Sequence, residues 1–204
     1  MKHLIRAASV AAALIATAAL GHADTLDQNN APLSYGNANP TAEWQQQVTA
    51  GASGLLAGIT LYDDSVAPLT ETLSIGIGNA FTSTFVISET VTLNAGGDYS
   101  LGSTFIDLST YNILLTAGET FVIDLSNGSG GWNTIIPASY AGGDLYVKVG
   151  SNSPVDWTTQ HGDSLAFQTY VDPAPTLTPE PSSMILLLTG LSAGAGLLRR
   201  RVKA

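Results

Sequence analysis

The sequence predicts an all-β protein, an antiparallel β-sandwich of the jelly-roll type. Short runs in which apolar residues alternate with polar or small ones recur between residues 55 and 171, a period typical of half-buried strands. Clusters of Gly, Asn, Asp and Pro suited to tight turns separate these runs. No stretch of 12 residues in this region has the apolar period of a helix, so no parallel crossover is implied. Roughly eight to ten short strands with such turns favour a sandwich.

The first 23 residues predict a secretory signal peptide, which we expect to be helical. Lys2 and Arg6 open it, an Ala-rich apolar stretch follows over residues 7–20, and small residues precede the expected cut. We therefore expect export through the Sec machinery and cleavage by signal peptidase between Ala23 and Asp24.

The mature chain divides into a leader, a sandwich domain and a linker. Residues 24–42 are polar and rich in Asn, Pro and Gly, which predicts an extended leader. The sandwich is expected over residues 43–172, and the Pro-rich residues 173–178 form a stiff linker. The strand-like runs within the sandwich are 55–61, 73–77, 85–93, 111–115, 121–125, 145–149 and 165–171.

Charge is distributed unevenly along the chain. Lys148 is the only Lys or Arg of residues 24–178, which carry 15 of the 16 acidic residues, so their formal charge is −14. Such a surface repels phosphate backbones and anionic lipid, which excludes nucleic acid as a partner. It attracts divalent cations, although acidity that serves solubility alone remains the alternative.

Composition also excludes several kinds of catalytic site. The chain has no cysteine, which rules out disulfides, thiol catalysis and Cys-based metal sites. His161 is the only histidine after the signal peptide, and no Gly-x-Ser-x-Gly motif occurs, so neither a serine triad nor a zinc site is expected. A solvated loop histidine is the alternative reading. A pair of carboxylates could still hydrolyse a glycoside, so a secreted glycan-active hydrolase stays as the alternative to a non-enzymatic protein.

Three aromatic residues are candidate glycan-binding residues, because sugar C–H faces pack on rings while sugar hydroxyls need polar partners. They are Trp132, Tyr140 and Trp157, each beside a Gly-rich or polar loop. The alternative is that each covers an end of the core.

Three segments of the second half, residues 115–121, 140–146 and 163–171, resemble jelly-roll β-sandwich domains of many bacterial exported proteins. The resemblance concerns fold and does not fix activity. By analogy with jelly rolls that hold one structural Ca²⁺ between their first and last strands, Glu43 and Asp163 are candidate calcium ligands, with Asp63 and Asp64 as a second pair. Solvated carboxylates in turns are the alternative.

The last 26 residues form an ordered, three-part segment. Pro179, Glu180 and Pro181 come first, and two prolines so close together keep the chain extended and accessible. Residues 182–198 are uncharged and at the lower length limit of a transmembrane helix. The basic tail, residues 199–204, marks the cytoplasmic side through Arg199, Arg200 and Arg201.

This order resembles the PEP-CTERM sorting signal of bacterial surface and secreted proteins, although Thr178 stands where the family often has valine. The resemblance implies that exosortase, a membrane protease, is a partner that removes the anchor. It implies a precursor held in the inner membrane and a product at the cell surface or in the extracellular matrix, where such proteins accompany exopolysaccharide and biofilm. An ordinary single-pass C-terminal anchor remains the alternative.

Overall fold

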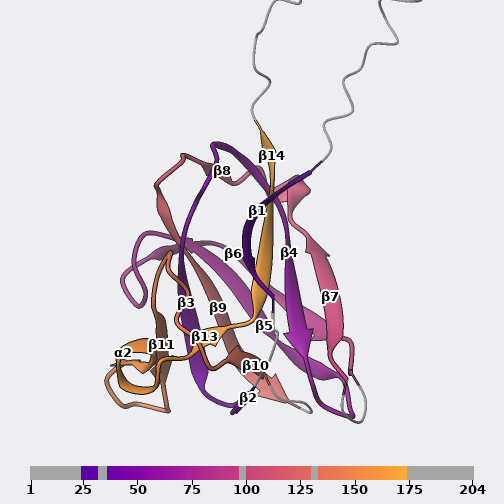
Figure 1. The fold of residues 1–204 in the computed structure, drawn as a ribbon, viewed down its shortest axis with the longest axis vertical. Coiled ribbons are helices and arrows are strands. Elements are labelled where there is room, and N and C mark those ends of the chain that lie inside the picture. The colour runs from indigo at the N-terminus through magenta and orange to yellow at the C-terminus, as the bar shows by residue number, and fades with distance from the viewer. Residues whose placement is uncertain (1–23, 32–35, 97–99, 130–132, 174–204) are drawn as a thin grey trace, which may run out of the picture. The chain divides into compact units, whose positions relative to one another are not determined.

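Two antiparallel β-sheets packed on each other form the predicted β-sandwich (Figure 1). The computed structural model describes residues 24–31, 36–96, 100–129 and 133–173. The strands are β1 (Thr25–Asn30), β2 (Gly36–Ala38), β3 (Glu43–Thr49), β4 (Gly54–Asp63), β5 (Leu69–Ile77), β6 (Thr84–Leu93), β7 (Gly102–Asp107), β8 (Leu114–Leu115), β9 (Thr120–Ser129), β10 (Asn133–Ile136), β11 (Leu145–Lys148), β12 (Val155–Asp156), β13 (Ser164–Leu165) and β14 (Phe167–Pro173). The helices are a 3-10 turn, η1 (Ser109–Tyr111), and α2 (Trp157–His161).

Strands distant in sequence are neighbours in both sheets. The eight-stranded sheet has the order β1-β14-β4-β10-β13, with β2 on β10 and with β7 and β8 on β4. The six-stranded sheet has the order β12-β11-β3-β9-β5-β6. Because β1 pairs with β14, with Thr25 opposite Val171, the eight-stranded sheet is complete only when both ends of the domain are in place.

The predicted leader is part of the sandwich. Its residues 25–30 and 36–38 form β1 and β2 of the eight-stranded sheet, rather than a segment outside the domain. Side-chain bonds add to the ladder: the Asn30 amide donates to the Leu165 carbonyl at 2.6 Å, and Tyr140 Oη donates to Gln28 Oε1 at 2.6 Å. The sequence hides these strands because their side chains are polar and their register is interrupted between Leu26 and Gln28.

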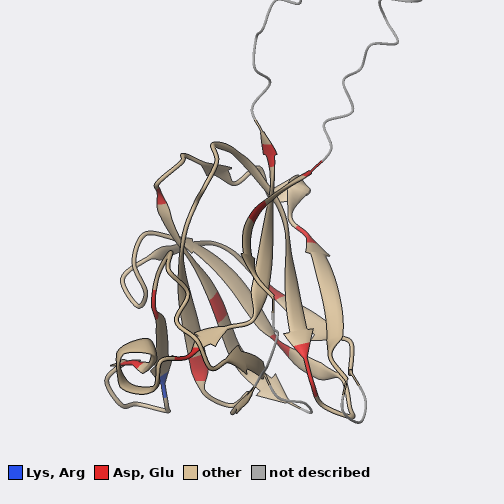
Figure 2. Cartoon of the chain, viewed as in Figure 1, with Lys and Arg blue, Asp and Glu red and all other residues tan. Residues whose placement is uncertain are grey.

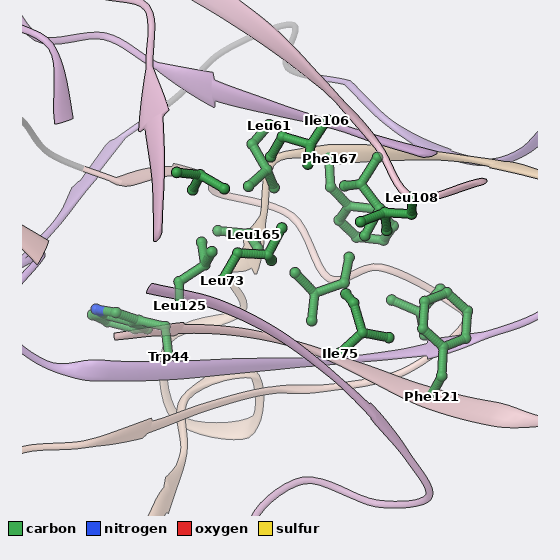
Figure 3. Close-up of a cluster of buried hydrophobic side chains, with 14 of the residues drawn as sticks. Trp44, Leu61, Leu73, Ile75, Ile106, Leu108, Phe121, Leu125, Leu165 and Phe167 are labelled. Atoms are coloured by element: carbon green, nitrogen blue, oxygen red, sulfur yellow. The ribbon is translucent and has the colours of Figure 1, made fainter. Parts of the chain in front are cut away.

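The core lies between the two sheets and is filled by alternate apolar residues of strands such as β4, β5 and β9 (Figure 3). Leu73 and Ile75 of β5 and Phe121 of β9 face Leu61 of β4 and Phe167 of β14, and all five side chains are buried. Burial of side chains of this size contributes about 1.5–3 kcal/mol each, so the core is the main source of stability in a chain without disulfides.

The short helix α2 has a defined start and end. The Asp156 carboxylate accepts a hydrogen bond from the Thr159 N–H at 2.8 Å, which is an N-cap. Gly162 ends the helix in the left-handed conformation, at φ 76°, where glycine carries no steric penalty. Five residues are too few to produce a readable helical period, so sequence patterning missed it.

Of the residues that the structure describes, none belongs to a helix long and apolar enough to cross a membrane. The predicted signal helix over residues 1–23 and the predicted transmembrane helix over residues 182–198 lie outside the described residues.

Candidate functional site

A groove of about 330 Å³ lies over the outer face of the six-stranded sheet. Its strand residues alternate with core residues: Trp44, Leu125 and Val147 point inward, so their neighbours point outward. The groove is lined by Thr41, Glu43, Phe85, Asp124, Ser126, Asn127, Lys148 and Gly150.

Asp124 forms the buried part of this groove. It lies on the inner strand β9, directly opposite Gln45 of β3 and Ser74 of β5, and is 2% exposed. Burial raises the pKa of its carboxyl to about 7, and the nearby Glu43 carboxylate also raises this pKa. The polar side chains of Gln45, Ser74 and Ser126 lower it. Its Oδ1 atom is buried without a hydrogen-bond partner among the described residues. Asp124 therefore borders the groove with a carboxyl group whose Oδ1 atom is itself covered.

Lys148 and Glu43 pair across neighbouring strands at the groove. The Lys148 Nζ atom lies 3.2 Å from Glu43 Oε2, and the Gln45 amide donates to Glu43 Oε1 at 3.0 Å. Lys148 ends β11 and is the only Lys or Arg of residues 24–178, and Figure 2 shows the resulting predominance of acidic segments over basic ones. Its ammonium also lies 5.7 Å from the centre of the Phe81 ring, within the range of a cation–π interaction.

Phe85 gives the groove an apolar wall. Its side chain is 43% exposed at the beginning of β6, although the neighbouring Gly76 makes room for the ring. An exposed ring beside a carboxylate, an ammonium and hydroxyl groups is the combination that suits a sugar, which has both C–H faces and hydroxyl groups. The arrangement can bind a small polar ligand from the open side of the sheet.

Two of the three predicted aromatic candidates are placed, and neither lies in this groove. Tyr140 packs on the core with its ring at 5.2 Å, edge to face, from Phe167, and burial raises its pKa to about 12. This arrangement supports the packing alternative for Tyr140. Trp132 lies outside the described residues.

Trp157 begins α2 and lines a separate, smaller hollow of about 200 Å³. Its ring meets Trp44 edge to face at 5.3 Å and stacks on His161 at 3.8 Å. The hollow lies on the opposite face of the β3–β11 pair from the groove, because Trp44 and Val147 line it and alternate with Glu43 and Lys148. His161 is exposed apart from this stacking.

The structure gives the predicted calcium ligands different partners. Glu43 pairs with Lys148, whereas Asp163 accepts a hydrogen bond from Trp157 Nε1 at 3.1 Å. Asp63 is fully buried inside the sandwich, and burial followed by the Asp63 charge raises the pKa of Asp64. Within residues 24–173, leaving aside the undescribed gaps, no three His, Asp or Glu side chains form a group that could hold a metal.

Sequence reasoning did not single out Asp124 or Phe85. A readable signal existed for the first: the run Phe121–Leu125 is FVIDL, and an acidic residue inside an apolar strand must be buried, paired or functional. The same signal marks Glu71 in the run LTETLSI. No feature of the sequence distinguishes Phe85, because the exposure of its ring depends on how β6 pairs at the edge of the sheet.

The predicted sorting motif Pro179–Pro181, the arginines 199–201 and the signal-peptide residue Ala23 lie outside the described residues. Asp24, expected as the first mature residue, is exposed just before β1.

No family model matches the chain, and no curated protein matches it. One solved structure, of infectious bursal disease virus Gx strain, is similar at 16% identity over 75% of this chain, with a TM-score of 0.23. The chain spans 36% of that protein's length. A similarity this weak carries no argument about fold or function.

Proposed function

We propose that this protein is a non-enzymatic, exported surface or extracellular-matrix protein, sorted through its Pro179–Pro181 motif by exosortase. The order of motif, apolar run and arginines at the end of the chain supports this. The sandwich, which we take to be of the jelly-roll type, is the part that would reach the surface.

We infer further that the groove over the six-stranded sheet binds a glycan. The observation that carries this inference is the buried, unpartnered Oδ1 of Asp124 beside the exposed ring of Phe85. An unsatisfied buried acceptor costs about 1–3 kcal/mol, and a sugar hydroxyl that displaces the groups covering Oδ1 and donates to it would remove this cost. Phe85 would pack against the sugar's C–H face.

Binding isotherms with the purified exported protein test the glycan proposal. A panel of neutral, amino and acidic oligosaccharides should contain at least one ligand whose affinity falls in the variant Asp124→Asn. Asp163→Asn, a change of the same chemistry at the carboxylate that accepts a hydrogen bond from Trp157 Nε1, serves as the matched control. Flat isotherms for every oligosaccharide would overturn glycan binding and leave a structural matrix protein.

A glycan-active hydrolase is the second candidate, and one observation favours it. Asp124 and Glu43 line the same groove, and the raised pKa of Asp124 keeps a part of it protonated at neutral pH, as a general acid requires. Glu43 is occupied by Lys148, which weakens it as a base. Incubation of the protein with the same panel should release no reducing ends; release that disappears in Asp124→Asn would establish the hydrolase instead.

A further inference from the structure

A polar cluster lies inside the apolar core, at a place that the glycan proposal does not use. It consists of Glu71 on β5, Asp63 at the end of β4 and Asn133 at the start of β10. All three residues are buried, with exposed fractions of 1%, 0% and 1%. Buried acids of this kind are rare in cores unless something compensates them.

Strand register brings the three side chains together between the sheets. Asp63 and Asn133 are directly opposite each other on β4 and β10, so they share a face, which is the core face of Leu61. Glu71 lies between Leu69 and Leu73 on the core face of β5, in the other sheet. The Asp63 Oδ2 atom accepts a hydrogen bond from the Leu69 N–H at 3.2 Å, which links the two sheets at this point.

The hydrogen bonds of this cluster are unequally satisfied. Asp63 accepts bonds from the Ser65 N–H at 2.9 Å and the Ser65 hydroxyl at 2.5 Å, in addition to the Leu69 bond. Both carboxyl oxygens of Glu71 and both amide atoms of Asn133, in contrast, are buried without a hydrogen-bond partner within the described part of the chain. Two unpartnered side chains therefore converge next to a satisfied carboxylate.

No basic side chain of the domain can balance this charge. Lys148 is the only Lys or Arg of residues 24–178, and it pairs with Glu43 on the outer face of the six-stranded sheet. Burial raises the pKa of Glu71 to about 8. The Asn133 side chain lowers this pKa, whereas the charges of Asp63 and Asp124 raise it. Either a proton or a bound cation must neutralise the cluster.

We propose that Glu71, Asn133 and Asp63 hold one calcium ion inside the sandwich. Their carboxylate and amide oxygens are the hard donors that Ca²⁺ takes, and the absence of nitrogen and sulfur donors argues against zinc. The unpartnered oxygens of Glu71 and Asn133 point to a ligand rather than to a finished hydrogen-bond network. The acidic surface of the domain raises the local concentration of divalent cations.

Calcium removal and return test this proposal on the exported protein. After treatment with EDTA and dialysis, CaCl₂ should raise the Tm and native mass spectrometry should show one Ca²⁺ for each chain. Glu71→Gln, which keeps the shape and removes the charge, should weaken calcium binding by at least about tenfold. Asp163→Asn, at the other residue of the sequence-predicted site and outside the groove, should bind calcium as the wild type does.

Three outcomes would overturn the site. One is a wild type that retains no calcium and whose Tm does not respond to CaCl₂, which would mean that a proton neutralises Glu71. Another is calcium binding that is unchanged in Glu71→Gln. If Glu71→Gln does not fold, Asn133→Asp is measured instead. In EDTA this variant should unfold more easily than wild type, and CaCl₂ should raise its Tm by more than it raises the wild-type Tm. An equal rise in Tm would contradict the proposal. Since no glycan is used, these outcomes are independent of the groove.

Discussion

Asp124 lies directly opposite Gln45 on the adjacent strand β3, and both side chains are almost fully buried although they face away from the core. An ionisable group is thus placed in a dry environment on the outer face of a sheet. The Phe81 N–H donates to Gln45 Oε1 at 2.6 Å, so the loop before β6 helps to cover this place. The properties of the groove depend on this pair.

We expect Asp124 to make the protein less stable as pH rises. Its folded pKa of about 7 lies above the 3.8 that is usual for an aspartate, so the folded state binds the extra proton between these values and the free energy of unfolding falls from pH 4 to pH 7. Asp124→Asn should remove roughly 2–4 kcal/mol of this pH dependence. Urea unfolding at several pH values measures it. An identical pH profile in wild type and variant would contradict the burial of the charge.

We expect Phe85 to contribute to glycan binding without stabilising the fold. Phe85→Ala should reduce affinity for any glycan that the groove binds by about tenfold, a loss of about 1.4 kcal/mol, and change Tm little, because the ring is 43% exposed. Phe105, which is 51% exposed on β7 of the other sheet, gives the matched control. Equal losses in Phe85→Ala and Phe105→Ala would place the binding surface elsewhere.

Phe121 should be essential for stability. Its side chain is fully buried between the sheets, and removal of a buried Phe typically costs about 3–5 kcal/mol from lost burial and the cavity that remains. Phe121→Ala should therefore unfold at a much lower urea concentration than wild type. The exposed-ring variant Phe105→Ala should unfold close to the wild-type concentration, and similar losses in both variants would contradict this core.

Gly54 should not tolerate a side chain. A Cβ atom at this position would collide with the backbone oxygen of Asp172, so Gly54→Ala must push β4 and β14 apart. We expect a loss of about 1–3 kcal/mol. Gly36→Ala is the control, because its Cβ would lie at an ordinary 3.7 Å from Ile135. Thermal unfolding distinguishes the two, and a harmless Gly54→Ala would show that the strands are less close than described.

Intact-mass measurement of the exported protein tests the sorting proposal. We expect the mature protein to begin at Asp24 and to lack Arg199–Ala204, because exosortase would have cut near Pro179. Replacement of Glu180 by Gln, with both prolines kept, should leave the anchor on a fraction of the molecules. A wild-type protein that retains its C-terminal arginines has not been processed, and an ordinary membrane anchor would then explain the segment.

The sequence predicted the strands whose side chains alternate and missed those whose side chains do not. Leu73 and Ile75 occupy the core face of β5 as a period of two requires. β1 was expected outside the domain, because TLDQNN has no apolar face and is held by backbone pairing with β14. Local pattern contains no information on a partner more than 130 residues away.

The groove and the buried cluster show the same limit for sites. The acidic letter inside each apolar run, Asp124 and Glu71, is visible in the sequence, but the face on which each lies depends on strand register. Glu43 and Asp163 were predicted by analogy to share a calcium ion. In the structure, Glu43 forms an ion pair with Lys148, and Asp163 accepts a hydrogen bond from Trp157. Composition identifies the residue types and long-range pairing decides which of them meet.

The position of β14 between β1 and β4 has a mechanical consequence for any pull on the chain beyond Pro173. Tension that enters at Pro173 acts along β14, which hydrogen-bonds to a neighbour on each side. Because inter-strand bonds run perpendicular to the strands, such a pull loads many of them at once in shear rather than opening them one by one. The last strand of the sandwich is therefore held against a pull along its length by two ladders of hydrogen bonds.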